Sequence, residues 1–248
     1  SNVHLANEYN RPEAEPDMTT SHDYIQSVQV WADAHFKGEG MVVSVIDSGV
    51  DPSHKDFVLS DDTEEYLTEE LVDGLVSSDG LKGKFYTEKV PYGYNYYDQN
   101  YEIKDVGPAP SEHGMHVAGT VAANGEIKGV APEAQVLGMK VFSNDPNYPS
   151  TWSDIYLAAI DESIKLGADV LNMSLGSTAS FYEVDSAEDV AITRAVENGI
   201  VSSVSAGNAG HIGRGWDNPL FQNPDIGLVG APGLNKDTIQ VAASGNTA

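Results

Sequence analysis

Four points of this chain carry side chains that could do chemistry together: Asp47, His113, the segment Ser174-Leu175-Gly176, and Asn208. A carboxylate beside an imidazole fixes the tautomer of the ring and stabilises the imidazolium, so that the imidazole can take a proton from a hydroxyl nucleophile. An asparagine amide near such a pair can donate a hydrogen bond to the oxyanion that forms on an attacked carbonyl. These residue types therefore indicate acyl transfer through a nucleophile.

Asp47 lies at the end of an element that would hold it in place. The run 41–46, MVVSVI, is short, rich in β-branched residues and without clean alternation, which predicts a strand buried on both faces. A carboxylate at the end of such a strand is costly unless it has a partner. Asp47 is thus either the first member of a site or a structural acid in an Asp-Ser-Gly turn.

The rest of the chain alternates between predicted strands and helices. Further strands are predicted at residues 90–97, 135–142, 169–173, 200–205 and 239–243. Helices are predicted at residues 22–36, 64–76, 113–124, 151–167 and 186–199, with Thr151 as the N-cap of the fourth and Ser186 opening the fifth. This order predicts an α/β fold with three layers, in which a mostly parallel sheet has helices on both faces. The carboxyl ends of parallel strands share an edge, so the four points can meet there.

The composition narrows the classes of partner. The chain has 248 residues, of which 40% are hydrophobic, and its formal charge is −25. Because phosphate binding needs Lys and Arg, no nucleic acid is expected as a partner. Cysteine is absent, which rules out disulfides and cysteine-based metal sites, and no apolar run is long enough to span a membrane. A calcium site made of loop carbonyls and one or two carboxylates stays open, and no metal ligand is assigned.

Ordered motifs give the chain a resemblance to the subtilisin family of serine proteases. Asp47-Ser48-Gly49 resembles the family's Asp motif, and residues 113–119, HGMHVAG, resemble its His motif, with Met115 in place of the more common threonine. Residues 174–176 resemble the segment that pairs with the substrate backbone, and residues 205–208, SAGN, resemble the segment of the oxyanion asparagine. The match runs from about residue 38 to residue 245 in the family's chain order.

The resemblance implies a role for each candidate residue and a subtilisin-like fold. Asp47 would orient His113, which would be the general base, and Asn208 would donate to the oxyanion. Gly207 and the segment Ser174-Leu175-Gly176 would border the bound substrate, a protein or peptide. This mechanism requires no cofactor, although structural calcium is common in the family.

Three other positions have competing interpretations. His113 is preferred over His116 as the base because it is the first histidine of the motif, and His116 is expected to be a packed, hydrogen-bonded residue. Asp51 is expected to be a turn residue or an ion-pair partner. The alternative for Asn208 is an ordinary turn residue.

The family's nucleophile lies in a Gly-Thr-Ser-x-Ala motif that this chain lacks. Within the family the chain resembles large Gram-positive cell-envelope proteinases of the lactocepin and complement-cleaving types, in which a second domain is typically inserted before that motif. Residues 38–248 are therefore expected to be the N-terminal part of a catalytic domain that is incomplete at its C-terminus. Residues 1–37 would form an N-terminal arm and a short helix. The serine is expected in the remainder of the same polypeptide, and this chain alone is expected to be inactive.

The predicted function is therefore that of a serine endopeptidase, secreted or attached to the cell wall. The alternative is a non-catalytic module that holds peptides in a protease-like cleft. A doubly wound nucleotide-binding protein is disfavoured, because no G-x-G-x-x-G sequence or Walker loop follows a predicted strand.

Overall fold

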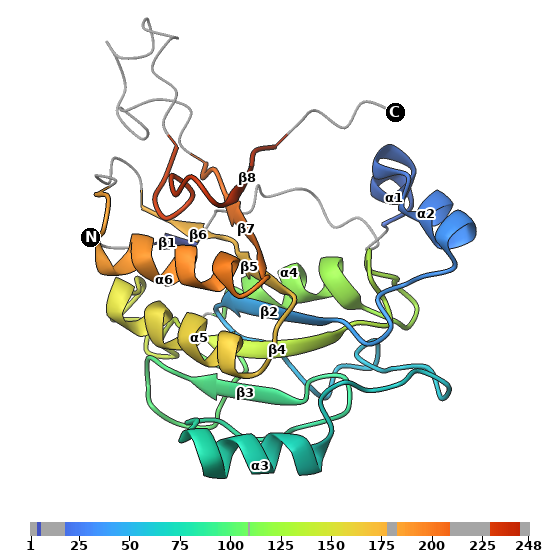
Figure 1. Cartoon of the computed structure of the whole chain (residues 1–248), viewed down its shortest axis with the longest axis horizontal. Coiled ribbons are helices and arrows are strands. Elements are labelled where there is room, and N and C mark those ends of the chain that lie inside the picture. The colour runs from blue at the N-terminus through green and yellow to red at the C-terminus, as the bar shows by residue number, and fades with distance from the viewer. Residues whose placement is uncertain (1–3, 6–17, 109, 178–182, 209–228, 244–248) are drawn as a thin grey trace, which may run out of the picture.

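The fold is built on a six-stranded sheet, in a computed structural model that describes residues 4–5, 18–108, 110–177, 183–208 and 229–243. The strand order is β3-β4-β2-β5-β7-β8, and all neighbouring pairs are parallel (Figure 1). The strands are β2 (Val42–Asp47), β3 (Tyr92–Asn95), β4 (Gln135–Lys140), β5 (Val170–Met173), β7 (Val201–Ser205) and β8 (Ile239–Val241). This arrangement confirms the predicted α/β fold with a parallel sheet.

Strand β2 is buried along its whole length because both of its faces are covered. Val42 and Ile46 belong to the larger core cluster on one face of the sheet, and Val43 and Val45 belong to the smaller cluster on the other. Successive side chains of a strand point to opposite faces, so a strand covered on both sides carries apolar residues on both faces. This explains why the run 41–46 lacks alternation.

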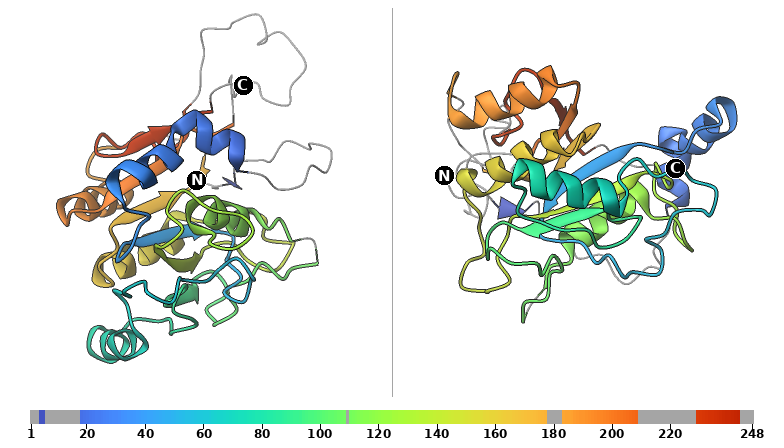
Figure 2. Two further views of the ribbon diagram at one scale, coloured as in Figure 1. Left: turned by 90° about the vertical axis from the view of Figure 1, so that its right-hand side faces the viewer. Right: turned by 60° about the horizontal axis from the view of Figure 1, so that its bottom comes forward.

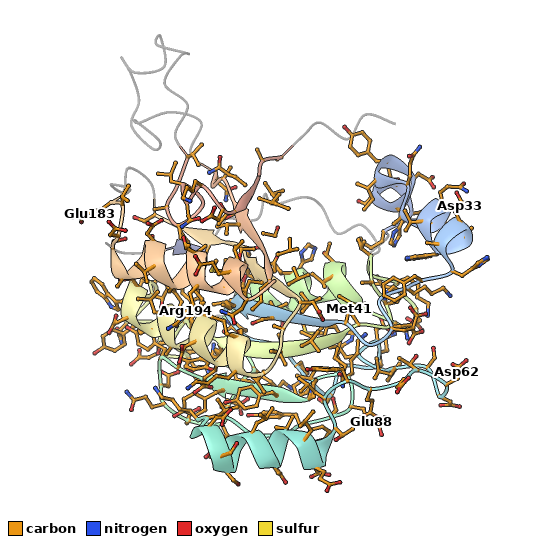
Figure 3. The ribbon with its side chains drawn as sticks, in the orientation of Figure 1. Asp33, Met41, Asp62, Glu88, Glu183 and Arg194 are labelled. Carbon is orange, nitrogen blue, oxygen red and sulfur yellow. The ribbon has the colours of Figure 1, made fainter. Side chains whose placement is uncertain are left out.

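Helices cover both faces of the sheet, as predicted. Figure 2 shows the sheet between α4 (His113–Ala122) on one face and the pair α5 (Ser153–Lys165) and α6 (Ala187–Glu197) on the other. Arg194 of α6, labelled in Figure 3, reaches Asp161 of α5 with an Nη2–Oδ1 distance of 2.5 Å. Met41, also labelled there, precedes β2 at the end of the strand away from Asp47.

The N-terminal and edge elements differ from the prediction in detail. The single helix predicted at 22–36 is wrong: α1 (Thr19–Ile25) and α2 (Ser27–Ala34) are separated by Gln26, whose φ of 60° places it in the left-handed region. The helix predicted at 64–76 is α3 (Glu69–Asp79), which begins later because the Thr68 side chain accepts a hydrogen bond from the Leu71 amide. The strand predicted at 90–97 is shortened to β3.

The caps of α5 and α6 show one wrong and one correct prediction. Ser186 caps α6, and its hydroxyl accepts from the Asp189 amide at 3.2 Å. The N-cap of α5 is Trp152 rather than Thr151, and Trp152 makes no side-chain capping hydrogen bond. The Thr151 side chain is fully buried instead, and its hydroxyl has no hydrogen-bond partner among the described residues. No helix in the described part of the chain is both long and apolar enough to cross a membrane.

A buried carboxylate network joins the loop after β2 to the far end of α4. Glu133 accepts hydrogen bonds from the Ser60 and Thr63 hydroxyls at 2.6 and 2.7 Å and from the Asn124 amide at 3.0 Å. Burial by itself would raise the pKa of Glu133, but these hydrogen bonds lower it from 4.5 to about 2. Glu133 therefore holds the loop, the helix end and the start of β4 together while it is ionised.

We expect Glu133→Gln to lower the free energy of unfolding at neutral pH by about 2 kcal/mol, because four donors lose a charged acceptor, the Ser60 amide among them. The native pKa lies below the unfolded one, so this stabilisation is present above pH 4.5 and is lost as the pH falls toward 2. Denaturant unfolding between pH 2.5 and 7 measures the difference, which should shrink toward acid pH. Glu126→Gln, at an ion-paired side chain that is 78% exposed, is the control. An effect of equal size at every pH would contradict the prediction.

Candidate active site

Asp47 and His113, which are far apart in the sequence, meet at the carboxyl edge of the sheet. The His113 Nδ1 atom lies 2.7 Å from the Asp47 Oδ1 atom, and both residues are buried, with exposures of 7% and 1%. Asp47 is the last residue of β2, and His113 is the first residue of α4. In this geometry the carboxylate accepts the Nδ1 proton, which leaves Nε2 as the basic atom of the neutral ring.

The turn after β2 is held against the start of α4 by its backbone and a hydroxyl. The Ser48 amide donates to Asp47 Oδ1 at 2.6 Å, and the Ser48 hydroxyl accepts from the Gly114 amide at 3.0 Å. A Cβ atom on Gly114 would lie 2.5 Å from the Gly49 carbonyl oxygen, so only glycine permits this approach. The Asp-Ser-Gly and His-Gly sequences thus form one packed unit.

The burial of Asp47 makes its ionised form costly. Burial raises the pKa of the Asp47 carboxyl above its usual range, against the lowering effects of His113, the Ser48 amide and the Lys140 charge. The Asp47 Oδ2 atom has no hydrogen-bond partner among the described residues. Because the two buried groups are in contact, their titration belongs to the pair rather than to either residue alone.

The neighbouring positions differ in how well they were predicted. The expectation that His116 is a packed residue is wrong: it is exposed, because it lies on the side of α4 opposite the buried stripe of Gly114, Ala118 and Ala122. Asp51 is both a turn residue and an ion-pair partner, since Oδ1 accepts from the Ser53 amide at 2.9 Å and Oδ2 lies 2.7 Å from the Lys104 Nζ atom. The Met115 sulfur accepts a hydrogen bond from the Asp51 amide at 3.2 Å.

The predicted substrate edge is occupied by another part of the same chain. Strand β6 (Leu175–Gly176) pairs in antiparallel fashion with β1 (His4–Leu5), in the register His4↔Gly176 and Leu5↔Leu175. Ser174, the residue before β6, accepts a hydrogen bond from the Asn172 side chain at 3.1 Å. The backbone of β6 at this edge therefore pairs with an extended strand, here that of β1.

Asn208 and Gly207 follow β7, the strand beside β5. Both are exposed, and Gly207 adopts a φ of 90°, which is in the left-handed region that favours glycine. The Ser205 hydroxyl donates to the Leu175 carbonyl at 3.2 Å and so joins the end of β7 to β6. These residues therefore stand at the same edge of the parallel sheet as Asp47.

Two contributors to the site were missed in the sequence. The Ser48 hydroxyl fixes α4, and the fully buried Lys140 donates from Nζ to the Ser48 carbonyl. A lysine inside the apolar run 135–142 was the available signal. In the described ranges, no group of three or more acidic, histidine or cysteine side chains could hold a metal ion.

Comparison with known proteins gives matches over most of the chain. The family model described as the subtilase family matches residues 38–247. The chain is 43% identical to the PI-type proteinase of Lactococcus lactis subsp. cremoris over 228 residues, which is 88% of this chain and 12% of that proteinase.

More distant relatives match over a similar part of the chain. It is 34% identical to the minor extracellular protease Vpr of Bacillus subtilis over 92% of this chain and 23% of that protein. It is 33% identical to the C5a peptidase of Streptococcus pyogenes over 84% of this chain and 18% of that peptidase. The chain thus spans less than a quarter of the length of each of these relatives. By its sequence match and its parallel sheet, this chain belongs to the subtilase family of serine proteases.

Proposed function

We propose that the polypeptide containing this chain is a serine endopeptidase and that this chain supplies its acid and its base. The observation that carries the proposal is the 2.7 Å contact between Asp47 Oδ1 and His113 Nδ1. With Nδ1 engaged by the carboxylate, Nε2 would take the proton from a serine hydroxyl and later return it to the leaving amine. The serine would come from another part of the same polypeptide, so this chain alone would be inactive.

The remaining candidates would act on the substrate. Asn208, at the end of the neighbouring strand, would donate to the oxyanion together with a backbone N–H. Gly207 and the segment Ser174-Leu175-Gly176 would border the residues before the cleaved bond. The antiparallel pairing of β6 with β1 supports this role, because an extended backbone lies along this edge in the structure. An extended protein or peptide segment is therefore the proposed substrate.

The proposed location is outside the cell, either secreted or attached to the cell wall. One relative carries the word extracellular in its name, and the absence of cysteine is compatible with such a location. No nucleic acid is proposed as a partner, given the formal charge of −25. Catalysis by this mechanism would require no cofactor, and a structural calcium site formed by loop carbonyls is proposed without a location.

We expect His113→Ala, made in the longest natural polypeptide that contains this chain, to lower kcat for a protein substrate by about 10⁴-fold, because the general base is lost. The matched control is His116→Ala, which removes an exposed histidine three residues later on the same helix. Initial rates with casein as the probe give the comparison, and circular dichroism verifies the fold of both variants. Equal activities of the His113 variant and the unmodified protein would remove His113 from the mechanism.

We expect Leu5→Pro to strengthen the binding of an extended peptide to this chain by about threefold to tenfold, because β1 would pair less well with Leu175. Fluorescence anisotropy of a labelled casein-derived peptide measures the dissociation constant. The control is Tyr24→Ala, at an exposed position outside the β1–β6 pairing. A second proline substitution, such as Leu71→Pro, is unsuitable because it would break α3.

The same binding assay, repeated with the longest natural polypeptide, separates the endopeptidase from the non-catalytic binding module. Peptide that is bound but never cleaved by that polypeptide would support the binding module. Unchanged affinity in the Leu5→Pro variant would mean that β6 is not the peptide-binding edge.

A further inference from the structure

A row of buried polar residues crosses three strands at the carboxyl edge of the sheet. Asn95 of β3, Lys140 of β4 and Asp47 of β2 are aligned in register, Asn95 with Lys140 and Lys140 with Asp47. Their exposures are 0%, 0% and 1%. Residues in register on neighbouring parallel strands point to the same face, which here is the face covered by α4.

Lys140 is the charged member of this row that the proposed mechanism leaves unused. Its Nζ atom donates to the Ser48 carbonyl, in the turn that directly follows Asp47. Within the described part of the chain, that carbonyl is the one acceptor of the ammonium, which has three N–H donors. A lysine that is fully buried for a single backbone contact is costly, so its charge must be offset by nearby carboxylates.

The charged groups that act most strongly on Lys140 are acidic. Asp105, Asp98 and Glu102 come from the loop between β3 and α4, and Asp47 comes from β2. Asp98 is itself fixed, since it accepts from the Asn95 amide at 2.9 Å and from the Ser143 hydroxyl at 2.6 Å. Asp47 is the only one of these four carboxylates that is buried, and it is in register with Lys140 on the neighbouring strand.

The neutral form of His113 leaves the charge of Asp47 without a counter-charge in the Asp47–His113 contact. When the imidazole is neutral, a carboxylate that is 1% exposed has no charged partner in His113. In that state the hydrogen bonds from Ser48 and His113 stabilise an ionised Asp47 only in part, and a positive charge nearby favours the ionised form further. Lys140 is the cation aligned with Asp47 in the sheet.

We propose that Lys140 is a positioning residue for the Asp47–His113 pair. It holds the Asp47-Ser48-Gly49 turn through the Ser48 carbonyl, and its charge keeps the Asp47 carboxylate ionised while His113 is neutral. The inference rests on the proposed function for its catalytic consequence, but the electrostatic coupling of Lys140 to the pair does not depend on hydrolysis.

The test removes the charge of Lys140 in two ways and follows His113. Lys140→Met removes the charge and the hydrogen bond, whereas Lys140→Gln retains an N–H donor for the Ser48 carbonyl. Lys89→Met is the matched control, because Lys89 is 1% exposed and also donates from Nζ to backbone carbonyls, those of Pro132 and Ala134. These carbonyls precede β4, at the end of the sheet away from Asp47.

Deuterium exchange at the histidine Cε1 position is measured by mass spectrometry in the longest natural polypeptide that contains this chain. Its pH dependence gives the midpoint of protonation of each imidazole. Without the positive charge the pair binds its proton more readily, so the His113 midpoint should rise by about one pH unit in both Lys140 variants. The Lys89 variant should leave it unchanged, and His54 and His116 serve as internal references. The acid limb of the kcat/KM profile for casein should move by the same amount.

Each outcome decides between the positioning role and a purely structural one. A midpoint that is unchanged in folded Lys140→Met and Lys140→Gln would overturn the proposal. Unfolding of both variants while Lys89→Met stays folded would also overturn it, since Lys140 would then act only on stability. If the unmodified polypeptide hydrolyses nothing, the proposed function fails, whereas the His113 midpoints still test the coupling.

Discussion

The structure depends on keeping one carboxylate, that of Asp47, in a place where water cannot reach it. At the end of a strand buried on both faces, this group loses its hydration and must be compensated by protein dipoles and charges. The amide of Ser48, the ring of His113 and the ammonium of Lys140 provide that compensation from three different elements. The same desolvation strengthens the interaction between the acid and the imidazole, because their charges are poorly screened.

The parallel sheet is what makes this compensation possible. Strands β3, β4 and β2 place side chains in register, so one row at the carboxyl edge carries Asn95, Lys140 and Asp47 toward the face of α4. The opposite face holds the larger apolar core beneath α5 and α6. Alternation along each strand thus separates a polar, reactive row from the packing that stabilises the domain.

Local sequence signals located the regular elements well where packing and local preference agreed. Ser186 caps α6 because its hydroxyl reaches the backbone three residues on, and this contact needs no tertiary partner. Thr151 has the same local preference, yet its side chain is buried beside the start of α5 and Trp152 takes the cap position. The break between α1 and α2 at Gln26 likewise could not be predicted from a glycine or proline, because neither residue type is present there.

Motif order and apolar periodicity are properties of the linear chain, and they were enough to predict the family and the parallel α/β fold, both of which are confirmed. They also led to the prediction of four points where chemistry could occur. The 2.7 Å contact between Asp47 and His113, the place of Lys140 in the same row and the pairing of β1 with β6 could be seen only in the folded chain. These contacts join residues separated by dozens of positions or more, and their geometry follows from strand register and helix placement. No local pattern of residue types encodes either of those.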